Sequence, residues 1–185
     1  MEYATLQNGI KMPMEGFGVF QVRDKAECKR SVLDAIRAGY RLIDLCQFVE
    51  VTPAVNQVET HVFQQQKTAH EYMEKYGVQH ESWGPFAEGR KDFFSNPVLT
   101  EIGRKYGKSS AQTALRFLLQ SNVVVIPKST HKERIAQNID VFDFTLSEAD
   151  MEAIRKLDEG ESLFFSHYDP ATVEMLTNMG KTRKA

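Results

Sequence analysis

The sequence predicts an α/β fold built on a parallel β-sheet and preceded by a β-hairpin. From residue 16 onward, segments of strand-like composition alternate with segments of helical periodicity, which is typical of a parallel sheet with right-handed helical crossovers. The segment 123–127 is an almost continuous β-branched run, as expected for a strand buried on both faces. The dipeptide Asn8-Gly9 separates two short extended runs and indicates the hairpin.

Local signals at helix ends support this order of elements. Asp24 is a suitable N-cap for the first helix, Gly77 a suitable stop for the second, and Pro97 suits the first turn of the third. Ser147, with Asp150 three residues later, is typical of the start of the last helix. The expected strands lie at 16–20, 41–44, 54–59, 78–85 and 123–127. The expected helices lie at 25–38, 64–77, 97–120, 130–142 and 146–160.

Composition favours a single cytoplasmic domain over residues 1–185. Hydrophobic residues make up 42% and charged residues 26%, which is ordinary for a globular protein. A formal net charge of −2 gives no electrostatic reason to expect binding to nucleic acid or to an anionic membrane. Cys28 and Cys46 suit a reducing compartment, and neither has neighbours spaced as in a metal site. No signal peptide or membrane-spanning run is expected.

The connection between the second and third expected strands is unusually short. Only the nine residues 45–53 separate the runs 41–44 and 54–59. Parallel neighbours normally need a crossover of about a dozen residues or more, usually a helix. The two runs are therefore not expected to be neighbours joined by an ordinary crossover.

Several stretches resemble the aldo-keto reductase family, in the order in which the family carries them. They are NGIKMPMEGFGVFQV, AIRAGYRLID, PAVNQVETHVFQQQ, ESWGPFAEGR, VVVIPKSTHKERIAQNIDVFDFTLS and LDEGESLFFSH. The resemblance implies an eight-stranded (β/α)8 barrel of the TIM type whose bottom is closed by an N-terminal hairpin. Such barrels typically need about 250 residues, so 185 residues predict an incomplete one.

The resemblance also implies which part is missing. Residues 41–44 match the family twice, as strand two and as part of the helix before strand six, which suggests an internal deletion with its junction near 41–46. If 41–44 form a strand, strands one, two, six, seven and eight remain, in the order six-seven-eight-one-two. If they are helical, the first helix extends to about 25 residues and four strands remain. We favour the strand slightly, because a helix end at Gly39 precedes it.

One candidate cofactor segment follows the strand 123–127. A helix start with added cations suits a phosphate dianion, although by spacing alone a solvated helix start is the better interpretation. The resemblance implies a site for the 2′-phosphate of NADP(H) and, further along the helix, contacts to its adenine. The phosphate residues would be Lys128, Ser129, Thr130 and Arg134, and the adenine residues Gln137 and Asn138.

A second candidate segment surrounds Trp83. A single tryptophan at a strand end is usually a core residue. The resemblance implies instead that Trp83 stacks on the nicotinamide ring and that Gln57 bonds to its carboxamide. The following loop, with Gly84, Pro85, Phe86 and Glu88, would wrap the pyrophosphate. The tail aromatics Phe164, Phe165 and Tyr168 are expected to pack on the body of the protein.

The catalytic group of the family is not matched. Asp44 corresponds to the aspartate that ends strand two, but residues 45–49 contain no tyrosine to act as the acid. The partner lysine and histidine belong to strands that have no counterpart here. We therefore expect Asp44 to be a remnant, and the family's NADPH-dependent reduction of small aldehydes or ketones to be impaired. The alternatives are a non-catalytic NADP(H)-binding protein, a homo-oligomer formed through open sheet edges, or a non-functional product.

Overall fold

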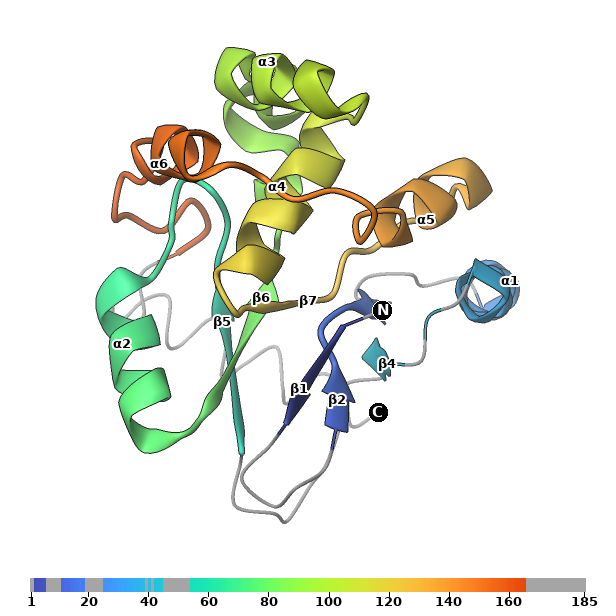
Figure 1. Cartoon of the computed structure of the whole chain (residues 1–185). Helices are drawn as coiled ribbons and strands as arrows, with labels where there is room; N and C mark the ends of the chain where they lie inside the picture. The colour runs from blue at the N-terminus through green and yellow to red at the C-terminus, as the bar shows by residue number, and fades with distance from the viewer. Residues whose placement is uncertain are drawn as a thin grey trace.

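The fold is a parallel sheet covered by helices, with a hairpin at its N-terminal end, in a computed structural model (Figure 1). The structure describes residues 2–5, 11–18, 25–38, 40, 42–44 and 54–165. The hairpin consists of β1 (Tyr3–Thr5) and β2 (Lys11–Pro13), which pair antiparallel. This confirms the predicted hairpin, although Asn8 and Gly9 lie outside the described residues.

Among the described residues, five short strands form the parallel part of the fold. They are β3 (Gly16–Gly18), β4 (Leu42–Asp44), β5 (Val55–Glu59), β6 (Gln79–Trp83) and β7 (Val124–Val125). The pairs β3–β4, β5–β6 and β6–β7 are all parallel. A parallel bridge between Glu15 and Val125, with Val125 N donating to Met14 O at 3.0 Å, joins the two groups. The resulting order, β5-β6-β7-β3-β4, is the order expected when 41–44 form a strand.

The helical alternative for residues 41–44 is wrong. Helix α1 spans Lys25–Ala38, and Leu42–Asp44 then pair with Gly16–Gly18 as β4. The Tyr40 N–H donates to Ala35 O at 3.1 Å at the end of the helix. The pairing of β4 with β3 satisfies backbone groups that a longer helix would satisfy internally. Residues 45–53, which carry the short connection, lie outside the described part of the chain.

The described residues form five further α-helices. They are α2 (Lys67–Tyr76), α3 (Pro97–Tyr106), α4 (Ser110–Gln120), α5 (Lys132–Ile139) and α6 (Glu148–Arg155). Helix α2 lies beside β5 and β6, α1 contacts α5, and α3 packs across α4 (Figure 1). Gly77 ends α2 in the left-handed conformation, and Ser147 caps α6 by accepting from Asp150 N, both as predicted.

The single helix predicted over 97–120 is wrong, because the chain forms α3 and α4 there. Gly107 adopts φ 67°, which ends α3 in the left-handed conformation. Ser109 then starts α4 with a capping box, in which its hydroxyl accepts from Gln112 N and the Gln112 side chain accepts from Ser109 N. These local signals stop one helix and start another although the apolar periodicity continues across them.

Two hydrophobic clusters hold the elements together. The larger one lies among the sheet, α3, α4 and α6, and includes Phe93, Leu99, Leu115, Leu118 and Ile154. The smaller one joins β3, α1 and α5 through Phe17, Ala35, Tyr40 and Ile135. Within the described residues, no helix is long and apolar enough to cross a membrane.

Candidate functional site at the carboxyl ends of the strands

The predicted cofactor residues follow three neighbouring strands at one edge of the sheet. The register places Gln57 opposite Glu81 and Glu59 opposite Trp83. Lys128 comes three residues after β7, which pairs with β6. Because the strands are parallel, their carboxyl ends meet at the same edge, where α/β enzymes place their chemistry.

A cavity of about 810 Å³ opens beside Trp83. Gln57 and Glu59 contribute to its wall from β5, and the segment 160–165 also lines it. The Gln57 side chain is exposed, and its Nε2 donates to Glu81 Oε1 at 2.7 Å. The cavity therefore combines an aromatic ring, an amide and a carboxylate, which can orient a planar polar ligand.

The loop after β6 is compact rather than open. Ala87–Ser95 form 3₁₀-type turns that are interrupted by left-handed residues, among them Glu88 at φ 51°. Gly84 adopts φ 66°, and its carbonyl accepts from Ala87 N at 2.8 Å. Pro85 is buried, whereas Glu88 is exposed. Phe86 packs edge-on against Phe93 at 5.9 Å, so this predicted cofactor residue is also part of the core.

The segment after β7 leaves both predicted phosphate-binding cations exposed. Neither Lys128 nor Arg134 forms an ion pair with another described residue. Ser129 is buried, and its hydroxyl accepts from His131 N at 3.1 Å. The Thr130 carbonyl accepts from the Arg30 guanidinium of α1 at 3.2 Å. The start of α5 is thus fixed in place while its cations remain open to an anion.

The two predicted adenine residues differ in exposure. Gln137 is exposed, but Asn138 is buried at 5% exposure, three residues after the buried Ile135 on the same side of α5. Gln137 is therefore open to a ligand, whereas Asn138 belongs to the inner side of the helix.

Asp44, the predicted catalytic remnant, is the last residue of β4 and pairs with Gly18. Residues 45–49, which contain no tyrosine to act as the acid, lie outside the described residues.

Glu59 was not singled out from the sequence, yet its carboxylate accepts hydrogen bonds from three described groups at this edge. Its buried carboxylate accepts from His61 Nε2 at 3.0 Å, from Leu163 N at 2.9 Å and from the Ser162 hydroxyl. Burial by itself would raise the pKa of Glu59, but these hydrogen bonds hold the pKa below its ordinary value. Phe63 N donates to His61 Nδ1 at 3.2 Å, so Nε2 carries the imidazole proton toward Glu59.

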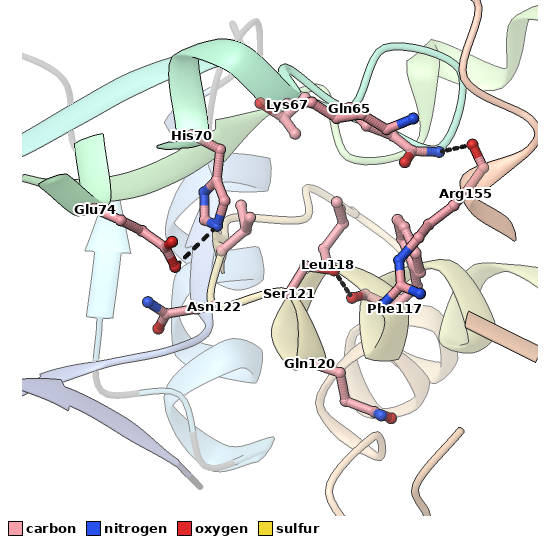
Figure 2. A pocket seen from close by; sticks show the side chains of 12 residues that line it. Gln65, Lys67, His70, Glu74, Phe117, Leu118, Gln120, Ser121, Asn122 and Arg155 are labelled. Carbon is pink, nitrogen blue, oxygen red and sulfur yellow. Dashed lines mark hydrogen bonds and ion pairs between the residues drawn. The ribbon is translucent and has the colours of Figure 1, made fainter. Parts of the chain in front are cut away.

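A second pocket, of about 340 Å³, lies among α2, α4 and α6 (Figure 2). Its cations are already paired, Lys67 with Asp158 at 3.2 Å and Arg155 with Glu148. His70 faces Glu74 at 3.3 Å, as Figure 2 shows. Because these charges already neutralise one another, the pocket attracts a charged ligand less strongly than the edge beside Trp83 does.

A largely buried polar chain begins in the wall of this pocket, which Thr60 and His70 both line. The Thr60 hydroxyl donates to Val58 O at 3.2 Å, so it accepts from His80 Nε2 at 2.8 Å. His80 Nδ1 must then accept from His70 Nδ1, which lies 2.8 Å away. Burial, with a smaller contribution from the nearby His70, lowers the pKa of His80 to about 4. His80 is therefore neutral, and its role is to satisfy buried polar groups.

The aldo/keto reductase family model matches residues 49–159, which is more than half of the chain. The chain belongs to the aldo/keto reductase family. The chain is 44% identical over 113 residues to methylglyoxal reductase DkgA of Escherichia coli (strain K12), covering 61% of this chain and 41% of that protein. It is 43% identical over 122 residues to glyoxal reductase of Bacillus subtilis (strain 168), covering 66% and 44%. This aldo/keto reductase thus spans less than half the length of these curated relatives.

Solved structures agree on the fold of this aldo/keto reductase. MGS-M4, an aldo-keto reductase from a Medee basin deep-sea metagenome library, has a TM-score of 0.80 at 24% identity, covering 91% of this chain and 99% of that one. A Gox0644 mutant in complex with NADPH has a TM-score of 0.80 at 22% identity, covering 89% and 96%. At this level of identity the likeness establishes the α/β fold of these enzymes.

Proposed function

We propose that this protein binds NADP(H) at the carboxyl ends of its strands and descends from a reductase of small aldehydes or ketones. The observation that carries the proposal is the common edge shared by Gln57, Trp83 and Lys128, beside a cavity of about 810 Å³. Family membership supports the nicotinamide cofactor. Lys128 and Arg134 are exposed and form no ion pair with another described residue, which favours a cofactor with an additional phosphate.

The residues of this edge have distinct roles in the proposal. Lys128 and Arg134 would hold the 2′-phosphate, assisted by Ser129 and Thr130, while Gln137 would face the adenine. Gly84, Pro85, Phe86 and Glu88 would line the pyrophosphate, and Gln57 and Trp83 would orient the nicotinamide. Because Asn138 is buried, it would support the helix rather than contact the base. Bound NADPH would supply the hydride for carbonyl reduction.

A calorimetric comparison of NADP⁺ and NAD⁺ tests this proposal. We expect Lys128→Ala to weaken NADP⁺ binding about tenfold or more, because a charge-assisted contact to phosphate is lost, and to leave NAD⁺ nearly unchanged. Lys132→Ala is the matched control, since Lys132 is an exposed lysine at the start of the same helix. Equal losses for both cofactors in the Lys128 variant would contradict the proposal.

We further propose that the chain is an incomplete barrel with strands one, two, six, seven and eight of its family, joined near residues 41–46. The order β5-β6-β7-β3-β4 supports this assignment. Asp44 would then be a catalytic remnant without its tyrosine, lysine and histidine. Like its family, the protein would work in the cytoplasm. Sequencing the gene from an independent DNA sample tests the deletion, because an intact segment there would contradict it.

Self-association is the alternative function that one observation favours. β5 is the end strand of the described sheet, and its Asn56 and Gln57 side chains are exposed. An exposed edge strand invites pairing with another chain. Size-exclusion chromatography with light scattering distinguishes the two functions: concentration-dependent dimers would favour the alternative, and a monomer that binds NADP⁺ would favour the main proposal.

A further inference from the structure

Residues 159–165, which we call the strap, run from the end of α6 across the carboxyl ends of β5 and β6. Glu159 N donates to Phe63 O at 2.9 Å, and Gly160 follows with φ 69°. Within the strap, the N–H groups of Phe164 and Phe165 each lie 3.1 Å from the Ser162 hydroxyl, to which they donate. The strap is therefore an ordered segment with its own hydrogen bonds.

Glu59 holds the strap from the inside. Of the three described groups that donate to its carboxylate, two, the Ser162 hydroxyl and Leu163 N, belong to the strap. Glu59 is only 6% exposed, and both of its charge-assisted bonds to the strap are partly buried, so solvent weakens them less than it weakens fully exposed pairs. Losing this carboxylate would leave two strap donors without an acceptor.

The contacts on the outer side are weaker by comparison. Arg90 donates to Leu163 O and lies 4.3 Å from the centre of the Phe164 ring, and Lys91 pairs with Glu159. Arg90, and the side chains of the Lys91–Glu159 pair, are exposed, and exposed ion pairs contribute little to stability. The partly buried bonds to Glu59 are therefore expected to hold the strap more strongly than the exposed Lys91–Glu159 pair does.

The strap places two aromatic rings on Trp83. The Phe165 ring is stacked on the indole, with centroids 5.9 Å apart and planes 19° apart. The Phe164 ring is tilted by 59° at 5.0 Å. These separations are typical of favourable aromatic pairs. A stacked phenyl ring occupies the kind of position that a planar heteroaromatic ligand of Trp83 would need.

We propose that Glu59 is a positioning residue that latches the strap, so that Phe165 covers a stacking face of Trp83 until a planar ligand displaces it. The latch itself depends only on contacts within the chain. The identity of the displacing ligand, the nicotinamide ring of NADP(H), rests on the proposed function. Regulation of access to Trp83 would then lie in the chain's own strap.

The latch can be measured without any ligand, because Trp83 is the single tryptophan of the chain. We expect Glu59→Gln and Ser162→Ala to raise the acrylamide quenching constant of Trp83 fluorescence about twofold, by opening the strap locally. Glu161→Gln, which removes an exposed carboxylate from the same strap, should leave it unchanged. Circular dichroism confirms that each variant is folded, and Ser162→Ala provides the test if Glu59→Gln is not. Unchanged quenching in a folded latch variant would overturn the proposal.

Titration with NADP⁺ tests whether the ligand displaces Phe165 from Trp83. If Phe165 competes with the ligand, Phe165→Ala should tighten NADP⁺ binding about threefold or more, because one stacking contact no longer has to be broken. Weaker binding by Phe165→Ala would overturn the displacement step, since Phe165 would then be part of the ligand's own contact surface. If no variant binds NADP⁺, the proposed function and displacement by its nicotinamide both fail, whereas the quenching result still decides the latch.

Discussion

The Tyr40 hydroxyl donates a hydrogen bond of 3.2 Å to Glu15 Oε1, and both side chains are almost completely buried. The second carboxyl oxygen of Glu15 has no hydrogen-bond partner among the described residues. Burial raises the pKa of Glu15 well above its ordinary value of 4.5. This pair joins Glu15, just before β3, to Tyr40, which lies between α1 and β4 and beside α5.

The pH dependence of stability should therefore report on Glu15. Its raised pKa means that its stabilising contribution is complete below about pH 4.5 and is lost as the pH rises toward the folded-state pKa. The wild type should lose free energy of unfolding through Glu15 as the pH rises from 5 to 8. Because glutamine cannot ionise, we expect this loss to be smaller by about 1–2 kcal/mol in Glu15→Gln. Urea unfolding across that range measures it. An unchanged pH profile would show that Glu15 does not titrate in this way.

Removing the Tyr40 hydroxyl, the other member of the pair, should instead lower the free energy of unfolding. Tyr40→Phe keeps the ring that packs on Phe17 but leaves the buried Glu15 without its hydroxyl donor. We expect a loss of about 1–3 kcal/mol in the free energy of unfolding, because a buried polar group becomes unsatisfied. The double variant Glu15→Gln with Tyr40→Phe should lose less than the sum of the separate effects predicts.

His80 should destabilise the protein in mild acid. Its pKa is about 4 in the fold and 6.5 ordinarily, so the unfolded chain takes up the proton first. The contribution of neutral His80 to the free energy of unfolding is fully present above pH 6.5. It falls by up to about 3 kcal/mol as the pH drops toward 4. Thermal melts from pH 7 to pH 4.5 should show a flatter profile for His80→Gln than for the wild type. His131→Gln, at an exposed histidine, serves as the control.

Two glycines near the C-terminal end of α3 should differ in how much their substitution by alanine destabilises the protein. A Cβ at Gly103 would lie 2.5 Å from Lys108 O and 2.8 Å from Thr113 Oγ1, so Gly103→Ala should cost about 2–4 kcal/mol. At Gly107 a Cβ would meet nothing within 4 Å, and only φ 67° opposes it. Gly107→Ala should therefore cost about 1 kcal/mol. Equal costs in chemical denaturation would contradict the close approach at Gly103.

Carbonyl reduction should be negligible in the purified chain. Residues 45–49 hold no tyrosine, and general acid catalysis alone is typically worth about 10²–10⁴-fold in rate. An assay of NADPH oxidation with several small aldehydes measures this, with Arg134→Ala as the control. Robust turnover that the Arg134 variant abolishes would contradict the expectation. Turnover that the variant leaves unchanged would indicate a contaminating reductase.

The sequence by itself determined the family, the hairpin and the alternation of strands and helices. These features rest on local signals, such as Gly77 ending α2 and Ser147 starting α6. Such signals act over a few residues and can be recognised without knowing what packs nearby. The same patterns did not separate α3 from α4, because the apolar periodicity runs through the short break at Gly107.

Only the tertiary structure decided between strand and helix at 42–44, since the choice depends on pairing with Gly16–Gly18, more than twenty residues away. The same holds for the role of Glu59, which becomes an anchor because Ser162 and Leu163 return to it across about a hundred residues. Residue type and spacing give no sign of such a contact. The chain has to fold before a carboxylate in one strand meets donors from the strap, and that meeting fixes the aromatic cover of Trp83.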